Sequence, residues 1–384
     1  MTGFAGEYLA ALAVFLLTAC YYAAERLKHE RNLNRIPLRI HVNGTRGKSS
    51  VTRLIAAGLR AGGRVVVAKT TGSAARVILP DGSERPLARR GPANIRELVP
   101  FTAEAAALGA EAIVVECMAV RPEMQRFAED KLVRAHIGVI TTIRPDHEEV
   151  TGEGPGVARA LAGAIPRQGA LVTTAAALDA LAAAGVAPAG AVRLAGPDEL
   201  PPACLEAFPG EVFPENVALA LTACELAGVD RATALRGMQT ASPDPGNVTV
   251  GEYAAAGRTV TLVNALAAND PESTRILWQR YAAGRASVIM LNCRPDRKYR
   301  TVQLAEALAA LHRGPYLVTG DGAFARRQLL KQGIAAADIR VIARPSSPAD
   351  LAGVTDGGKL TVFAAGNVQG LENFLNCRTA GVNT

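Results

Sequence analysis

Short apolar segments alternate with helix-patterned stretches from residue 36 to about residue 240. The pattern predicts strands at 38–42, 64–68, 112–116, 137–142 and 170–174, and helices at 49–61, 95–109, 157–165 and 215–227. Residues 76–83 predict a hairpin, because Asp81-Gly82 suits a tight turn. Strands that alternate with helices indicate an α/β fold with a mostly parallel sheet and helices on both faces.

A second alternating series follows residues 242–246, where two prolines and a glycine predict a linker. This series predicts strands at 259–264, 286–292, 315–319, 339–343 and 360–364, and helices at 271–283, 302–312 and 323–332. We therefore expect three parts: an N-terminal segment at 1–35, a central α/β domain at 36–243 and a smaller Rossmann-like α/β domain at 247–384.

An uncharged run of 17 residues, Tyr8 to Ala24, lies near the start of the chain. This length is at the lower limit for crossing a bilayer. The basic residues Arg26, Lys28, Arg31 and Arg35 follow it, which predicts a membrane helix with the body of the protein in the cytoplasm.

This segment has three alternative interpretations. A secretory signal is disfavoured because residues 1–7 carry no basic residue. Residues 17–20 resemble a lipoprotein processing box, but export would place the phosphate loop described below where ATP is scarce. A buried helix of the body is the remaining alternative.

Composition and charge limit the classes of molecule that the protein is expected to bind. Apolar residues make up 49% of the chain and aromatic residues only 4%, so the cores are predicted to be aliphatic. The net charge is +7, but no basic run with interleaved aromatics indicates nucleic-acid binding. The charge favours an acidic or phosphorylated substrate. The six cysteines lack metal-type spacing, which fits a reducing compartment.

A glycine-rich loop directly follows the strand at 38–42. Its residues are Asn43, Gly44, Thr45, Arg46, Gly47, Lys48, Ser49 and Ser50, and a predicted helix comes next. Glycines let backbone N–H groups approach phosphates, and the helix N-terminus adds positive potential. We expect Lys48 to reach the β/γ-phosphates of ATP and Ser49 to hold Mg²⁺. The strict P-loop pattern has glycine where this chain has Val42.

Two further strands end in polar residues. Glu116 closes the apolar strand at 112–116, and Asp146 and His147 follow the strand at 137–142. Ligands bind beyond the carboxyl ends of parallel strands, so Glu116 is a candidate metal ligand or base. A solvated strand end is the alternative for Glu116, and a helix cap beside an incidental histidine is the alternative for 146–147.

Together, Asn-Gly-Thr-x-Gly-Lys-Ser at 43–49, Glu116 and Thr-Thr-Ile-x-Pro-Asp-His at 141–147 resemble the ATP-dependent Mur ligases and folylpolyglutamate synthases. Residues 41–49, 68–76, 89–95, 264–273 and 366–370 are most similar to one branch, the poly-γ-glutamate synthase ATPase subunits of the CapB family. The resemblance covers almost the whole chain, and Arg46 marks this branch. It implies a P-loop, Mur-ligase-like central domain followed by a smaller Rossmann-like domain.

The resemblance also implies roles for individual residues. Lys48 and the loop amides would bind phosphates, Ser49 and Glu116 one Mg²⁺, and His147 a second. Asn216 would contact adenine, although Pro214 replaces the histidine expected there. In the second domain, Asn264 and Arg294 would bind nucleotide, and Asn269 and Asp270 the acceptor. A polyanionic substrate would also give Arg76, Arg89, Arg90 and Arg144 carboxylates to pair with, against the alternative of solvated surface charge.

One departure from the family pattern concerns the second metal. Mur ligases carry a carbamylated lysine at a position that falls near Ala162, and this chain has no lysine between Lys131 and Lys298. Either Glu148 or Glu149 supplies a ligand instead, or the second Mg²⁺ binds weakly.

The reaction implied is ATP-dependent polymerisation of glutamate. ATP phosphorylates the γ-carboxylate of the growing chain, and the α-amine of the next glutamate attacks the acyl phosphate. Small multi-span membrane subunits are expected partners, with homo-oligomerisation left open. The alternatives are a folate- or peptidoglycan-type acceptor, and a membrane-tethered ATPase that drives export without glutamate.

Overall fold

The chain folds into two compact units in the computed structural model, Met1–Asp244 and Pro245–Thr384. The structure describes residues 2–71, 75–89, 91–144, 148–152, 154–244, 248–255, 258–268, 270–351, 359–371 and 374.

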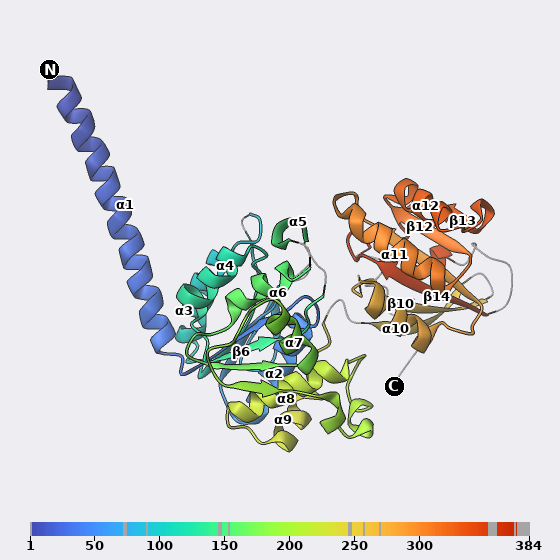
Figure 1. The fold of residues 1–384 in the computed structure, drawn as a ribbon, viewed down its shortest axis with the longest axis horizontal. Helices are drawn as coiled ribbons and strands as arrows, with labels where there is room; N and C mark the ends of the chain where they lie inside the picture. Colours follow the sequence, from blue (N-terminus) through green and yellow to red (C-terminus); the bar gives the residue numbers. More distant parts are fainter. Residues whose placement is uncertain are drawn as a thin grey trace. The chain divides into compact units, whose positions relative to one another are not determined.

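An eight-stranded sheet forms the centre of the first unit, in the order β4-β3-β2-β5-β1-β6-β7-β8 (Figure 1). Its strands are β1 (Leu38–Asn43), β2 (Val66–Lys69), β3 (Arg76–Ile78), β4 (Glu84–Pro86), β5 (Ala112–Glu116), β6 (Ile137–Ile140), β7 (Ala170–Thr173) and β8 (Val192–Leu194). The neighbouring strands in the series β2-β5-β1-β6-β7-β8 pair in parallel. Strands β3 and β4 pair antiparallel at the edge beyond β2. The central strands β1, β5 and β6 are largely buried because both faces of the sheet are covered. Their buried residues are mostly apolar, apart from His41, Asn43 and Glu116.

Helices cover both faces of this sheet. They are α2 (Lys48–Ala61), α3 (Leu98–Ala107), α4 (Pro122–Phe127), α5 (Glu148–Thr151), α6 (Gly156–Leu161), α7 (Ala175–Ala183), α8 (Pro214–Leu226) and α9 (Arg231–Met238). On one face, α2, α8 and α9 pack together and share a core with β1 and β6. On the other face, α3 and the π-helical turn Ala128–Val133 form a second core with β2 and β5.

The N-terminal helix α1 runs from Thr2 to Asn34 and extends away from the sheet (Figure 1). Ala10–Asn34 is long and apolar enough to cross a membrane, although a single helix of this kind near the N-terminus is weak evidence for a span. The alternative of a buried helix is wrong, because every side chain from residue 10 to residue 24 is exposed.

The last turns of α1 are docked on the body. Leu33 is buried, and the His29 Nε2 lies 3.0 Å from the Leu132 carbonyl oxygen. Arg96, just before α3, donates to both carboxylate oxygens of Glu25 at 2.8 and 2.9 Å and lies over the Tyr22 ring. The helix is therefore fixed to the first unit at its C-terminal end.

The second unit has a six-stranded sheet in the order β13-β12-β11-β14-β10-β9. Its strands are β9 (Thr249–Ala255), β10 (Arg258–Asn264), β11 (Ser287–Cys293), β12 (Tyr316–Gly320), β13 (Ile339–Val341) and β14 (Lys359–Gly366), and its α-helices are α10 (Pro271–Tyr281), α11 (Lys298–Leu311) and α12 (Gly322–Lys331). Only β9 pairs antiparallel within the described residues of this sheet. Val260, Met290 and Val362 belong to a core beneath it.

The predicted α/β class with two sheet-containing parts is confirmed, and several elements were missed. The missed strands and α-helices are β8, β9, α4, α5, α7 and α9. Strand β9 contains Gly251 and Glu252, residue types that are depleted in strands, so its local sequence does not predict a strand. Antiparallel pairing with β10 holds these residues in the extended conformation. The predicted helix at 302–312 begins four residues earlier, at Lys298. Residues 245 and 246 of the predicted linker lie outside the described residues.

Candidate functional site

The loop between β1 and α2 depends on two glycines. Gly44 has φ 138° and Gly47 has φ 83°, backbone conformations that L side chains rarely adopt. A Cβ at Gly44 would lie 2.0 Å from Thr141 Oγ1, and one at Gly47 would lie 2.5 Å from Asn216 Oδ1. Both glycines therefore also allow a close approach, which places Asn216 of α8 directly beside the loop.

The loop is tied to the segment that follows β6. The Thr45 N–H donates to the Thr142 carbonyl at 2.9 Å, and the Arg46 N–H donates to Thr142 Oγ1 at 3.1 Å. Val42, at the position of the pattern's first glycine, is fully buried in β1 and is in register with Glu116 of β5. A strand residue thus occupies the position of the pattern's first glycine, and the turn begins two residues later, at Gly44.

Ser49 and Glu116, the two residues expected to share one Mg²⁺, are in contact. The Ser49 hydroxyl donates to Glu116 Oε2 at 2.8 Å, and the Thr71 N–H donates to the same oxygen at 2.7 Å. The Glu116 side chain is buried, so the interpretation as a solvated strand end is wrong. A hydroxyl and a carboxylate are hard oxygen ligands that suit Mg²⁺, which usually completes its shell with water and phosphate oxygens. The donor set therefore fits the metal.

Lys48 lies at the start of α2. Its Nζ donates to the Gly44 carbonyl at 2.7 Å, so the side chain folds back over its own loop. The ammonium group therefore lies beside the loop whose backbone N–H groups would bind phosphate.

A buried ion pair lies beside Glu116, at the end of β2. Lys69 is fully buried, and its Nζ is 3.2 Å from Glu97 Oε2. Arg89 Nε reaches the other oxygen of Glu97 at 2.7 Å, so Arg89 is already engaged within the protein. Burial lowers the pKa of Lys69, and the carboxylates of Glu97 and Glu116 oppose that shift. Sequence reasoning assigned Lys69 no role, although a lysine that ends the apolar run Val65-Val66-Val67-Ala68 is a visible signal.

Beneath the loop, β1 contributes His41 to a second buried pair. His41 Nδ1 is 2.8 Å from Glu129 Oε2, while Glu129 Oε1 accepts from the Ala135 N–H. Burial by itself lowers the pKa of His41, but the neighbouring Cys117 and Glu129 outweigh burial and raise the pKa to about 10. The imidazolium is thus held charged below the site.

This pair makes stability dependent on pH. The folded-state pKa of His41 is about 10 against an ordinary value of 6.5, so its contribution is complete below pH 6.5 and is lost as the pH rises through 10. The unfolding free energy of the first unit should therefore fall by about 1 kcal/mol per pH unit within this window. Chemical denaturation at pH 6.5, 8 and 9.5 tests the slope, and a His41→Gln variant that keeps the same slope would contradict it.

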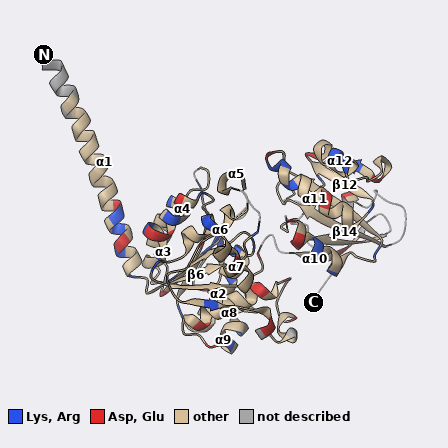
Figure 2. Ribbon diagram, viewed as in Figure 1, with Lys and Arg blue, Asp and Glu red and all other residues tan. Residues whose placement is uncertain are grey.

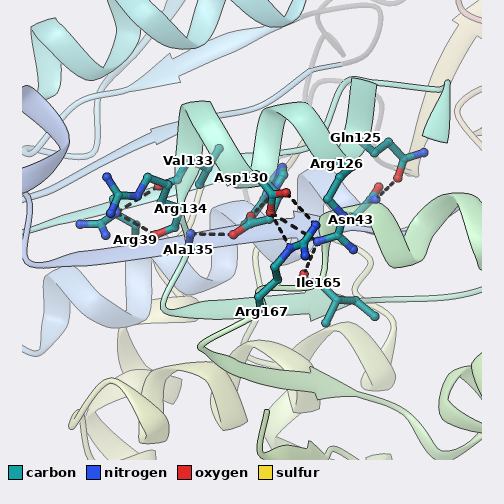
Figure 3. A network of polar contacts seen from close by, with 12 residues as sticks. Arg39, Asn43, Gln125, Arg126, Asp130, Val133, Arg134, Ala135, Ile165 and Arg167 are labelled. Carbon is teal, nitrogen blue, oxygen red and sulfur yellow. Dashed lines mark hydrogen bonds and ion pairs between the residues drawn. The ribbon is translucent and has the colours of Figure 1, made fainter. Parts of the chain in front are cut away.

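Asn43 is fixed by a polar network from α4 (Figure 3). Its Nδ2 donates to Gln125 Oε1 at 2.6 Å, and Gln125 in turn donates to the Val120 carbonyl. The Asn43 side chain is therefore engaged with α4, while the backbone of the residue begins the loop.

Comparison with known proteins decides the family. The model of the poly-γ-glutamate synthase CapB C-terminal domain matches residues 250–378, and that of the Mur ligase middle domain matches residues 42–164. The capsule biosynthesis protein CapB of Bacillus anthracis is 40% identical over 301 residues, which cover 76% of this chain and 64% of that protein. The PGA synthase CapB of Bacillus subtilis is 37% identical over 290 residues, covering 73% of this chain and 74% of that protein. The chain belongs to the CapB family. The predicted resemblance is confirmed.

Solved structures agree on the fold. Mycobacterium tuberculosis folylpolyglutamate synthase complexed with ADP superposes with a TM-score of 0.62 at 17% identity, over 90% of this chain and 92% of that one. A Yersinia pestis folylpolyglutamate synthase/dihydrofolate synthase, complexed with AMPPNP and a Mn ion, gives 0.61 at 15% identity, over 89% and 90%. This CapB-family chain therefore has the fold of the folylpolyglutamate synthases.

The position of the absent family lysine is filled by other contacts in this CapB-family chain. Ala162 is buried, and its carbonyl accepts from Arg126 Nη2 at 2.7 Å. Arg126 Nη1 reaches the Ile165 carbonyl at 3.1 Å (Figure 3). The guanidinium of Arg126 thus holds the backbone of this segment. The side chains of Glu148 and Glu149, the alternative ligands, lie outside the described residues.

Some of the other predicted site residues are described by the structure and some are not. Arg76 begins β3 and Arg144 follows β6, and both are half-buried. Arg46 Nη1 donates to the Thr45 carbonyl at 2.9 Å. Asp146, His147, Arg90 and Asn269 lie outside the described residues, so the expected second-metal and acceptor contacts through them stay predictions.

In the second unit, the predicted residues lie at the carboxyl ends of β10 and β11. Asn264 ends β10, and its Oδ1 accepts from the Leu266 N–H at 3.3 Å. Asp270 caps α10 by accepting from the Ser273 N–H, which is a structural role in itself. Arg294 follows β11 and is paired with Asp296 at 2.6 Å. Nucleotide or acceptor binding by these residues stays a prediction.

Proposed function

We propose that this CapB-family chain is an ATP-dependent amide ligase that joins glutamates through their γ-carboxylates. The contact of Ser49 with the buried Glu116, at the end of a glycine-rich phosphate loop, carries the proposal. The printed names of the relatives, a capsule biosynthesis protein and a PGA synthase, support glutamate as the substrate. ADP and AMPPNP in the folylpolyglutamate synthases support ATP as the cosubstrate.

Residues of the first unit would have distinct roles in activating the carboxylate. The loop amides and Lys48 bind the β/γ-phosphates and neutralise charge on the transferred phosphoryl group. Ser49 and Glu116 would hold Mg²⁺, which would supply further charge neutralisation on the phosphate oxygens. The γ-carboxylate of the growing chain is phosphorylated, and the α-amine of the next glutamate displaces phosphate from the acyl phosphate to form the amide. The reaction uses no protein nucleophile.

Product analysis tests this proposal. Membranes that carry the protein, supplied with ATP, Mg²⁺ and labelled glutamate, should release one ADP per amide bond, with the bond located at the γ-carboxyl by NMR. An obligatory folate or nucleotide-sugar acceptor would instead indicate another branch of the superfamily. Steady ATP hydrolysis without glutamate, and without any amide product, would indicate an export ATPase and contradict the proposal.

We also propose that α1 anchors the protein in the cell membrane, beside multi-span synthase subunits. The exposed apolar side chains Leu12, Phe15, Leu16 and Leu17 support a lipid-facing helix. Arg26, Lys28 and Arg31 on its C-terminal side support a cytoplasmic body.

Removing residues 2–21 should move the protein from the carbonate-washed membrane pellet to the supernatant. The thermal midpoint should not change, because the contacts of Tyr22, Glu25 and His29 with the body are kept. Removing residues 2–32 is the matched comparison and should lower the midpoint. A shorter truncation that still pellets after washing would argue against the anchor.

A further inference from the structure

The positive charge of the chain is concentrated in one stretch of the second unit. Residues 294–331 contain eight lysines and arginines and three aspartates and glutamates. This tenth of the sequence therefore carries a net charge of +5, against +7 for the whole chain. Such a concentration creates a local positive potential that a dispersed charge does not.

The fold brings exposed cations of this stretch together. Helices α11 and α12 pack against each other, and both carry basic residues (Figure 2). The basic surface consists of the exposed Lys298, Arg327 and Lys331, the last of which lies one turn beyond Arg327 on α12. Lys298 Nζ lies 5.5 Å from the centroid of the Phe324 ring, and Arg327 Cζ lies 5.8 Å from the same centroid. The two helices thus present their cations around one aromatic ring, with Lys298 and Arg327 both exposed.

The acidic residues of the same stretch do not neutralise this surface. Asp296 is paired with Arg294, which is not part of the basic surface. Among the described residues, neither Glu306 nor Asp321 forms an ion pair with Lys298, Arg327 or Lys331. The surface is therefore suited to an extended anion with many charges rather than to a single carboxylate.

Family information points to which anion this is. The family model that matches residues 250–378, and so contains the basic surface, is the one described for poly-γ-glutamate synthases, whereas the model shared with Mur ligases matches residues 42–164. A γ-linked glutamate polymer keeps one free α-carboxylate per residue, which makes it a flexible polyanion.

We propose that the basic surface of α11 and α12 is a binding site for the poly-γ-glutamate chain, formed by the second unit and not by the unit that carries the phosphate loop. This inference rests on the proposed function. The site retains the polymer between additions, so the same chain is extended repeatedly. Because the side chains are exposed, the attraction is screened by salt over about 8 Å at physiological ionic strength.

Binding of a labelled γ-linked decaglutamate to the detergent-solubilised full-length protein tests the proposal. Changing Lys298→Glu and Arg327→Glu together should weaken binding by about tenfold or more at low salt, since each basic residue beside a polyanion contributes substantially. The same pair changed to glutamine should lie between this variant and the wild type. Binding by the wild type should also weaken as salt rises.

Arg285→Glu is the matched control, because Arg285 is exposed in the same unit but precedes the amino end of β11, whereas Lys298 follows its carboxyl end. It should bind decaglutamate as the wild type does. In the synthesis assay, the Lys298/Arg327 variant should release ADP at the wild-type initial rate but make shorter chains.

Three results would overturn the proposal: equal binding by the wild type and the double variant, equal losses in the double variant and Arg285→Glu, or displacement of decaglutamate by vesicles rich in phosphatidylserine. The last result would assign the surface to a membrane. The binding assay needs no catalysis, so a wild-type protein that binds decaglutamate yet makes no amide would contradict the proposed function alone.

Discussion

Replacing Glu116 with glutamine is expected to lower ATP- and glutamate-dependent ADP release by about 10³-fold, with folding intact. The amide keeps an oxygen that can accept from the Thr71 N–H and the Ser49 hydroxyl, as Glu116 Oε2 does at 2.7 and 2.8 Å. It lacks the negative charge that binds Mg²⁺. The measurement is ADP release as a function of Mg²⁺ concentration.

Ser49→Thr is the control for this variant, because it keeps a hydroxyl at the same position beside Glu116. It should retain most of the activity, whereas Ser49→Ala should lose it. If the Glu116→Gln protein worked at the wild-type rate with an unchanged Mg²⁺ requirement, the assignment of Glu116 to the metal would be wrong.

Replacing Gly44 with alanine should abolish nucleotide binding and destabilise the first unit by about 2–5 kcal/mol. Left-handed backbone costs an alanine about 1–2 kcal/mol, and crowding in a packed site adds about 1–3. The added Cβ would lie 2.0 Å from Thr141 Oγ1, so the loop must leave the segment after β6. Isothermal titration with ADP and chemical denaturation measure the two effects.

Gly63→Ala separates strain from crowding. Gly63 also has positive φ, at 84°, but no atom lies within 4 Å of its added Cβ. This variant should lose only about 1 kcal/mol and bind ADP normally. Equal losses of stability in the two variants would mean that the approach of Thr141 to the loop is unimportant.

Hydrophobic patterning predicted the central strands well, because they are buried on both faces and most of their buried residues are therefore apolar. Residues 112–116 form β5 with the predicted bounds, and 38–42 form β1 with one added residue. Local sequence was less informative at the edges of the sheets. The three residues of β8, Val192 to Leu194, are partly exposed and are ordered as a strand by pairing with β7.

The candidate site was predictable where chemistry follows a strand directly, as at Gly47, Ser49 and Glu116. It was not predictable where two distant segments bury charges together. Arg53 lies in a helix whose sequence gives no sign of its burial, yet it is 4% exposed because its guanidinium meets Glu84 from β4. Lys69 and Glu97 are 28 positions apart in sequence and meet only in the fold. No local pattern encodes such pairs, because a buried charge requires its partner.

Arg96 and Glu97 are neighbours in sequence but bind different parts of the first unit. Arg96 forms an ion pair with Glu25 and lies over the Tyr22 ring of α1, while Glu97 forms an ion pair with Lys69 beside Glu116. A membrane helix docked in this way is a rigid spacer and not a flexible linker. About fifteen ångströms of helix separate residue 24 from residue 34, at 1.5 Å per residue. The height of the phosphate loop above a membrane would therefore be fixed by the fold, and each new polymer end would form at a constant distance from the bilayer.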